Sequence, residues 1–238
     1  MKKLIIISVL FFICVNSFAT KYYVDYTSGN NSNDGSIGSP WKTWNYAMDV
    51  ASLNAGDTVY FRGGVYIPED LDGGYGIDCE RNGSEGNYIN FWAYPGETPI
   101  LDCRDVTPAI TGNYPLSMGP MTYIHFKGLT IRNAFQKKAT DEVNAWRITS
   151  SENVIVENCV IHDVHGGAFC NYSNNVNLYY INCDAYNCCD SLTTLKPGND
   201  GTGFLAINST STTDTSYYIN NRAWNCGDQG FSGGSSGS

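Results

Sequence analysis

The sequence predicts an all-β protein whose chain winds into a right-handed parallel β-helix, a solenoid with a cap at its N-terminal end. Short apolar segments separated by Gly, Asn and Asp fill the chain beyond residue 85. Four of these segments share one pattern without gaps, and a second, shorter pattern ending in Phe recurs between them. Repeats of short strands and turns are typical of solenoids, because each coil covers the apolar face of its neighbour.

The repeats define which residues should lie above one another in successive coils. The four aligned segments are residues 126–133, 156–163, 180–187 and 218–225. The shorter pattern occupies residues 167–169, 202–204 and 229–231. Unequal spacing places insertions in loops, notably at residues 191–200 and 209–215. Equivalent strands should pair about 4.8 Å apart, and the equivalent Asn158 and Asn182 are expected to form an amide ladder at a bend.

Residues 20 to about 66 are the predicted N-terminal cap of a single β-helix domain that spans residues 20–231. One strand is expected at residues 21–26 and another at residues 58–66. Between them, apolar residues recur at near-helical spacing, which predicts one short helix from about residue 43 to residue 53. The apolar residues of this helix are Trp44, Ala47, Met48, Ala51 and Leu53.

Both ends of the chain predict segments outside the folded domain. Lys2 and Lys3 precede an apolar run, and small residues end at Ala19, which predicts that residues 1–19 are a cleaved signal peptide. The apolar run is too short to cross a hydrocarbon core of ~30 Å as a helix. We therefore expect no membrane span, and a monomer that is secreted, periplasmic or at the cell surface. Residues 232–238 are all Ser or Gly, which predicts a flexible tail and indicates a truncated or incomplete reading frame.

Composition and charge exclude some classes of partner. Hydrophobic residues make up 42% of the chain and charged residues 16%, so a packed core is expected rather than disorder. The formal net charge of -9 argues against nucleic acid as a partner, because phosphate binding needs a basic face. An acidic protein can still hold an acidic polysaccharide when a divalent cation bridges the carboxylates.

The cysteines are better explained by stacking than by metal binding. No C-x-x-C pair occurs, which argues against zinc. The repeats place Cys159 over Cys183 and Cys188 over Cys226, at a spacing wider than the ~3.8 Å between Cβ atoms that a disulfide prefers. We therefore expect buried stacked thiols in preference to disulfides, which are the alternative for an exported chain.

Two sets of sequence runs resemble known proteins. The mature chain opens with Tyr-Tyr-Val-Asp at 22–25, Ser-Pro-Trp-Lys-Thr at 39–43 and Gly-Asp-Thr-Val-Tyr-Phe-Arg-Gly-Gly-Val-Tyr at 56–66. These runs resemble the N-terminal cap of exported β-helix polysaccharidases. Further along stand Cys-Asp-Ala-Tyr-Asn at 183–187, Asn-Arg-Ala-Trp-Asn at 221–225 and Asp-Gln-Gly-Phe at 228–231. This more specific set resembles pectate lyases of polysaccharide lyase family 9.

The resemblance implies a calcium site. In the family, an Asp-Gly-Phe on one coil and an Asp-Asp-Gly-Phe-Asp on the next supply the ligands. Here Asp228 matches the second motif, whereas Thr202 stands at the first Asp and Asp200 lies two residues before it. Gln229 and Ser232 replace the other two acidic residues. Because calcium prefers hard oxygen ligands, Asp228 and Asp200 are the candidate metal ligands.

The resemblance further implies a polysaccharide lyase that cleaves pectate or another polyuronate by calcium-assisted β-elimination. In this reaction calcium acidifies the proton beside the sugar carboxylate, and a lysine removes that proton. The lysine of the family should lie further along the chain, but no Lys follows Lys196. We therefore expect the chain as written to be inactive or incomplete, and we assign no catalytic residue. The alternative is a non-catalytic glycan-binding or cell-surface β-helix.

Two other titratable residues have simpler interpretations. His162 is equivalent to Tyr186 and Trp224, which predicts a strand position that faces solvent or lines a groove. Lys196 precedes Pro197 and is expected to be a solvated loop charge. A glycoside hydrolase on the same fold would need a pair of acidic residues that the sequence does not place.

Overall fold

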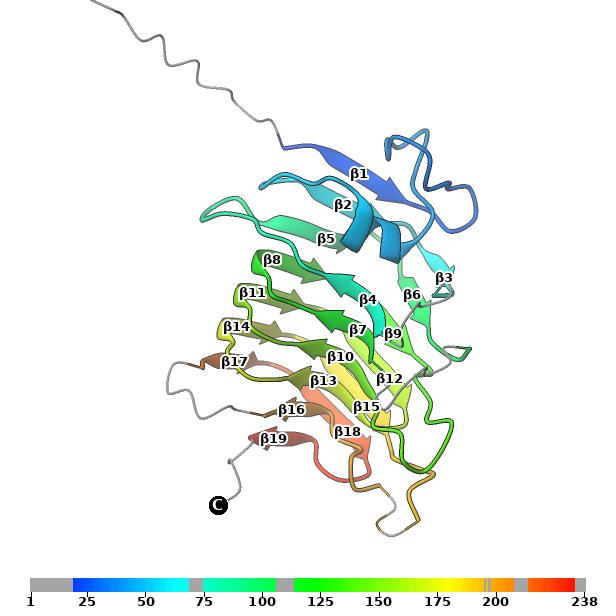
Figure 1. The fold of residues 1–238 in the computed structure, drawn as a ribbon, viewed down its shortest axis with the longest axis vertical. Helices are drawn as coiled ribbons and strands as arrows, with labels where there is room; N and C mark the ends of the chain where they lie inside the picture. Colours follow the sequence, from blue (N-terminus) through cyan, green and yellow to red (C-terminus); the bar gives the residue numbers. More distant parts are fainter. Residues whose placement is uncertain are drawn as a thin grey trace, which may run out of the picture.

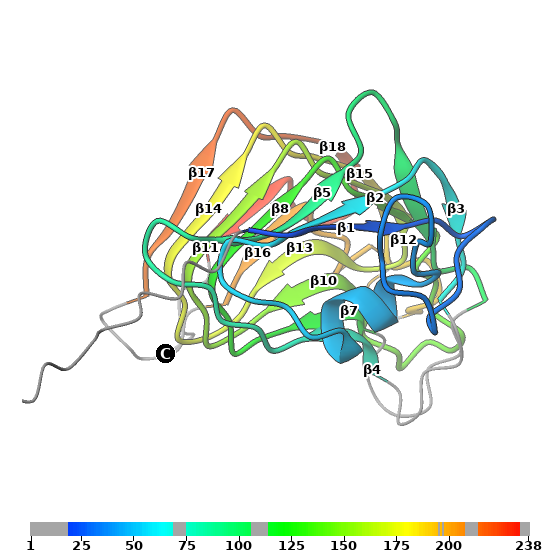
Figure 2. The ribbon, with the colours of Figure 1, turned by 90° about the horizontal axis from the view of Figure 1, so that it is seen from above.

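The computed structural model describes residues 19–68, 75–105, 114–194, 196, 198–207 and 214–233. In these residues the chain forms three sheets in which every neighbouring pair of strands is parallel (Figure 1). The first two strands pair in one sheet, and from the second strand onward successive strands enter the three sheets in turn, so each circuit adds one coil to a solenoid. This confirms the predicted parallel β-helix. Seen from the capped end, the three sheets enclose a common interior (Figure 2).

The three sheets are named here by the order in which the chain enters them. The first sheet contains β1 (Lys21–Val24), β2 (Thr58–Phe61), β5 (Ile89–Ala93), β8 (Thr122–Lys127), β11 (Glu152–Glu157), β14 (Val176–Ile181) and β17 (Ser216–Ile219). The second sheet contains β3 (Gly64–Tyr66), β6 (Pro99–Asp102), β9 (Thr130–Arg132), β12 (Val160–Val164), β15 (Asp184–Cys188) and β18 (Arg222–Cys226). The third sheet contains β4 (Tyr75–Cys79), β7 (Tyr114–Met118), β10 (Asn144–Ile148), β13 (Gly167–Asn171), β16 (Phe204–Ala206) and β19 (Phe231–Gly233).

The strand register confirms the alignment of the repeats. Residues that the sequence made equivalent are paired in neighbouring strands. The paired residues are Phe126, Val156, Tyr180 and Tyr218 in the first sheet, and Phe169, Phe204 and Phe231 in the third. A register set by buried side chains is firm, because a shift by one residue would turn each apolar side chain to the outside.

Aromatic rings stack along the axis inside the coils. The ring of Phe204 lies 4.8 Å from that of Phe169 and 4.8 Å from that of Phe231, and both pairs are nearly parallel. Trp146 extends this column by one coil, at 6.0 Å from Phe169. Such stacks bury large apolar faces, which stabilises the fold by roughly 25 cal/mol per Å² removed from water.

The turns from the first to the second sheet explain the recurring Asn residues. Gly128, Asn158, Asn182 and Asn220 each begin such a turn with a positive φ, between 53° and 72°, which Gly and Asn adopt more readily than other residues. The amide ladder expected at Asn158 is not what the structure has, because its Nδ2 donates to Glu157 of the same coil.

A ladder of side-chain hydrogen bonds forms instead near the C-terminal ends of the second-sheet strands. Asn187 donates to Asp163 at 2.8 Å, and Asn225 donates to Asn187 at 3.2 Å. These residues again have positive φ, so the side chains of successive coils are aligned there.

The cap differs from its prediction in two details. The expected helix over residues 43–53 is a shorter π-helical turn, η1 (Tyr46–Val50), closed by a bond from the Ala51 N–H to the Tyr46 carbonyl. This turn buries Ala47 and Met48 against the end of the solenoid. The strand predicted over residues 58–66 is two strands, β2 and β3, because the chain bends at Arg62 and Gly63 from the first sheet into the second.

The eight cysteines of the predicted mature chain are unpaired thiols, six of them buried. Cys159 and Cys183 lie in adjacent coils, and burial together with the Cys183 thiol raises the pKa of Cys159. Cys188 pairs in register with Cys226, and the hydrogen bond between the two thiols brings the pKa of Cys226 down to about 7. The arrangement matches the expected stack of thiols.

The structure describes only a few residues of the two predicted terminal segments. Of the predicted signal peptide the structure describes Ala19 alone, and the segment stays a prediction. β19 continues to Gly233, two residues into the stretch that the sequence assigned to the tail. In the described part of the chain, no helix has the length and apolar character needed to cross a membrane.

Candidate functional site

The structure brings the two predicted metal ligands together. Asp200 comes from the loop between β15 and β16, and Asp228 from the loop between β18 and β19, one coil further on. Both line a cavity of about 260 Å³ beside the third sheet. The backbone N–H of Asp228 donates to the carbonyl of Gly201 at 3.2 Å, which ties the two loops to each other. The remaining lining residues are Glu142, Val143, Asn144, Tyr172, Asn199, Thr202, Leu205 and Ile207.

A third carboxylate, Asp190, holds the first of these loops in shape. Its side chain is 1% exposed, and Oδ1 accepts the backbone N–H of Thr193 at 3.1 Å. Its backbone carbonyl accepts the N–H of Gly198 at 2.8 Å. Oδ2 is buried with no hydrogen-bond partner among the described residues. A buried carboxylate oxygen normally has a partner, so this loop has unused capacity to accept a proton donor or a cation.

The carboxylates repel one another. Partial burial, and then the nearby charges of Asp190 and Asp228, raise the pKa of Asp200 above its ordinary value. Oδ1 of Asp200 accepts a hydrogen bond of 3.3 Å from the Asn199 amide, which offsets only part of this effect. The cavity therefore has a negative potential that favours cations.

The donor set suits a hard cation but does not enclose one. Carboxylate, amide and hydroxyl oxygens are the ligands that calcium prefers. Within the described residues, however, no group of three or more His, Cys, Asp or Glu side chains could hold a metal ion. Thr202, at the place of the family's first Asp, is 3% exposed. Asp200 and Asp228 would therefore supply part of a coordination shell and leave positions for other ligands.

Sequence analysis missed Asp190 and Glu142. Asp190 follows the strand β15 and resembles an ordinary turn residue. Glu142 precedes Asn144 by two residues, as Asp200 precedes Thr202. Extending the third-sheet repeat back by one coil, with Trp146 in place of Phe, would have found Glu142.

Removal of the Asp200 charge should stabilise the fold at neutral pH. A carboxyl pKa that is higher in the folded than in the unfolded state costs stability above that pKa, and the cost disappears as pH falls to the ordinary value of about 4. Asp200→Asn should therefore raise the urea midpoint at neutral pH in a chelator, and the gain should shrink on acidification. Equilibrium unfolding at several pH values measures this.

Asp163→Asn is a control for which we expect the opposite change in stability. Partial burial of Asp163 is outweighed by hydrogen bonds from Asn187 and His162, so its pKa lies below the ordinary value. Removing this charge should lower stability at neutral pH. A loss of stability in Asp200→Asn would contradict the repulsion described above.

The other titratable residues lie where the sequence placed them. His162 stacks on Tyr186 at 4.8 Å, and Tyr186 on Trp224 at 4.5 Å, along the outer face of the second sheet. Lys196 is exposed in the loop between β15 and β16. Neither His162 nor Lys196 lines the acidic cavity.

Comparison with known proteins fits this architecture. Residues 22–236 match the family model described as Pel9A-like, right handed beta helix region. The chain belongs to this Pel9A-like family. The match confirms the expected relationship to pectate lyases of polysaccharide lyase family 9 and the right-handed winding of the coils. No curated protein matches the Pel9A-like chain.

Solved structures share the Pel9A-like fold at low identity. A rhamnogalacturonan lyase is 24% identical with a TM-score of 0.71, over 87% of this chain and 52% of its own. The pectate lyase Pel9A is 22% identical with a TM-score of 0.68, over 90% of this chain and 50% of its own. A GH136 lacto-N-biosidase from Eubacterium ramulus is 16% identical with a TM-score of 0.61, over 85% and 41%. The Pel9A-like chain thus spans about half the length of these structures or less, and the likeness establishes the fold.

Proposed function

We propose that this chain binds an acidic polysaccharide, pectate or another polyuronate, through calcium held at Asp200 and Asp228. The observation that supports this most is that the two carboxylates come from successive coils and line the same cavity. A polymer lying along the axis of the solenoid would pass both. We further propose that the protein is exported, as residues 1–19 predict, and that it acts as a monomer.

Calcium explains how two acidic partners can associate. A calcium ion takes six to eight oxygen ligands, of which this cavity would supply only part. Carboxylates of the polyuronate and water molecules would fill the rest. The ion would also offset the partial burial and the carboxylate repulsion that together raise the pKa of Asp200. Bound calcium would draw electron density from the sugar carboxylate, which is the chemistry that β-elimination requires.

The names of the neighbouring structures are consistent with a polysaccharide ligand. The two most similar structures cited above are described as a rhamnogalacturonan lyase and a pectate lyase. A non-catalytic role for this chain is the second candidate, because the described lining of the cavity contains no Lys, Arg or His. Both candidates share the binding step.

Asp228→Asn tests that step. The substitution keeps the shape of the side chain but removes one charged ligand, and fewer charged ligands weaken calcium sites. We expect the calcium-dependent affinity for polygalacturonate to fall about tenfold or more, which corresponds to ~1.4 kcal/mol. Calorimetric titration with and without calcium measures it.

A matched control is available in the second sheet. Asp163→Asn also removes one negative charge, at a place where the equivalent residues of other coils are the Asn residues 133, 187 and 225. This variant should bind as the wild type does. Equal affinity in Asp228→Asn and Asp163→Asn would remove the acidic cavity from the proposed function.

A further inference from the structure

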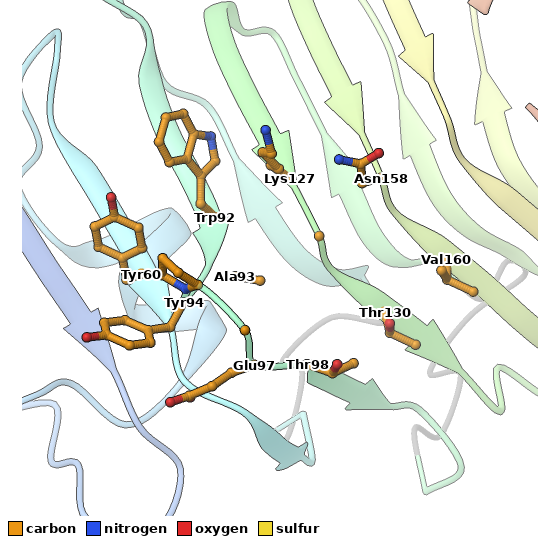
Figure 3. Close-up of a pocket in the computed structure, with 13 residues that line it drawn as sticks. Tyr60, Trp92, Ala93, Tyr94, Glu97, Thr98, Lys127, Thr130, Asn158 and Val160 are labelled. Carbon is orange, nitrogen blue, oxygen red and sulfur yellow. The ribbon is translucent and has the colours of Figure 1, made fainter. Parts of the chain in front are cut away.

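A second and larger pocket lies on another side of the solenoid. It has a volume of about 560 Å³ and opens where the first sheet turns into the second, whereas the acidic cavity adjoins the third sheet (Figure 3). Trp92, Lys127 and Asn158 stand in a row on one side of the pocket, with Tyr60 and Tyr94 beside them and Glu97, Thr98 and Thr130 opposite (Figure 3).

The pocket exists because one turn is longer than its neighbours. In five coils the turn from the first to the second sheet has two residues, as between Phe61 and Gly64, but the turn from β5 to β6 has five, residues 94–98. The longer turn forms one wall. The small residues Ala93 and Gly128 also line the pocket, and a Cβ added at Gly128 would lie 3.0 Å from that of Ala93.

Aromatic rings form a second wall. Tyr60 lies 6.2 Å from Trp92 and 5.9 Å from Tyr94, each pair meeting edge to face. Tyr23 extends the cluster at 5.7 Å from Tyr60. The indole N–H of Trp92 is buried without a hydrogen-bond partner among the described residues. The outer face of this sheet therefore offers apolar ring surface to the pocket.

The charges around the pocket are paired. Arg62 contacts Glu97 at 2.8 Å, and Lys127 contacts Glu157 at 2.9 Å. The Arg62 guanidinium also lies 4.7 Å from the centre of the Tyr94 ring. Two positive and two negative side chains leave no net charge to attract an ion, in contrast to the acidic cavity.

We propose that this pocket binds a neutral sugar unit of a polysaccharide. Ligand pockets combine apolar and aromatic walls with a few polar groups that fix orientation. A sugar ring has an apolar face of C–H groups and a rim of hydroxyls, which suits the Tyr60 and Trp92 rings on one side and the Thr98 and Thr130 hydroxyls on the other. The inference uses the proposed function only for the ligand class, because it concerns another sheet and requires no calcium.

Affinity electrophoresis in a chelator tests the pocket with three neutral polymers, galactan, arabinan and fully methyl-esterified polygalacturonate. At least one should retard the wild-type protein. Trp92→Ala should weaken that binding by at least about tenfold, since the indole ring supplies aromatic contact surface that a methyl group does not. Trp224→Ala is the matched control, because Trp224 is an exposed Trp of the second sheet, outside the pocket.

A second variant tests the pocket without removing a side chain that packs against the sheet. Thr98 is exposed on the long turn, so Thr98→Trp should fill the pocket without altering the core, and it too should abolish retardation. No retardation of the wild type by any of the three polymers would overturn the proposal, as would unchanged retardation of Thr98→Trp.

Asp228→Asn separates this inference from the proposed function. The variant should keep the binding of the neutral polymer and lose calcium-dependent binding of polygalacturonate, whereas Thr98→Trp should do the reverse. Loss of neutral-polymer binding in Asp228→Asn would overturn the separate pocket. Failure of the wild type to bind polygalacturonate with calcium would overturn the proposed function alone.

Discussion

Phe169→Ala should lower the free energy of unfolding by about 3–5 kcal/mol, the usual cost of removing a buried Phe side chain. Phe169 is 1% exposed and lies between Trp146 and Phe204 in the column of rings beneath the third sheet. It also meets Tyr180 of the first sheet edge to face at 5.6 Å. Truncation would therefore leave a cavity between two sheets and two coils, which close packing does not let neighbours refill.

The same column provides the control. Phe231 occupies the equivalent position at the end of the described column and is 49% exposed. Phe231→Ala should cost less than about 1 kcal/mol, because a half-exposed ring transfers less area from water. Urea unfolding followed by circular dichroism compares the two variants, since the midpoint and slope together give the free energy. A similar cost at both positions would mean that the column does not act as a continuous core.

This column was predictable because its pattern repeats. Phe at residues 169, 204 and 231 marks one inward position in three coils, and a β-helix needs the same position filled in every coil. The predicted pairing of Val156 with Tyr180 was correct for the same reason. Each repeat therefore indicates independently which residue type occupies a given structural position.

Features that occur once were not predictable in this way. The π-helical turn at Tyr46–Val50 depends on how the cap fits the end of the solenoid, which helical spacing alone does not specify. The predicted hydrogen-bond partner of Asn158, the amide of the next coil, was wrong because the charged carboxylate of Glu157 in the same coil accepts the bond instead. The neutral pocket depends on the small side chain of Ala93 and the missing one of Gly128 next to one long turn, a combination that only the fold brings together.

The candidate site was predictable from the sequence only in part. Asp228 follows the repeat closely, so its place in the loop before β19 was predictable. Asp200 lies in a loop whose course is set by the buried Asp190, an interaction that no sequence pattern indicates. The structure nevertheless places Asp200 and Asp228 at one cavity, and their role as metal ligands stays a prediction.

Residues 20–238 should show no measurable lyase turnover on polygalacturonate, even under conditions in which the proposed calcium-dependent binding is detected. β-Elimination needs a base beside the sugar proton, and loss of a general base costs about 10²–10⁴-fold in rate. The described lining of the acidic cavity offers carboxylates but no Lys or His.

The ultraviolet absorbance of the unsaturated uronide product measures turnover directly, and calorimetry on the same sample shows that polymer is bound. Binding without product would place this chain among the glycan-binding members of its fold. Robust product formation would contradict the prediction and would mean that another group takes the proton. Asp200, whose raised pKa makes it a stronger base than an ordinary carboxylate, and Lys196 in the same loop are then the two residues to replace. Loss of product in Asp200→Asn with polymer binding retained would identify the carboxylate as the base, whereas loss in Lys196→Ala would identify the amine.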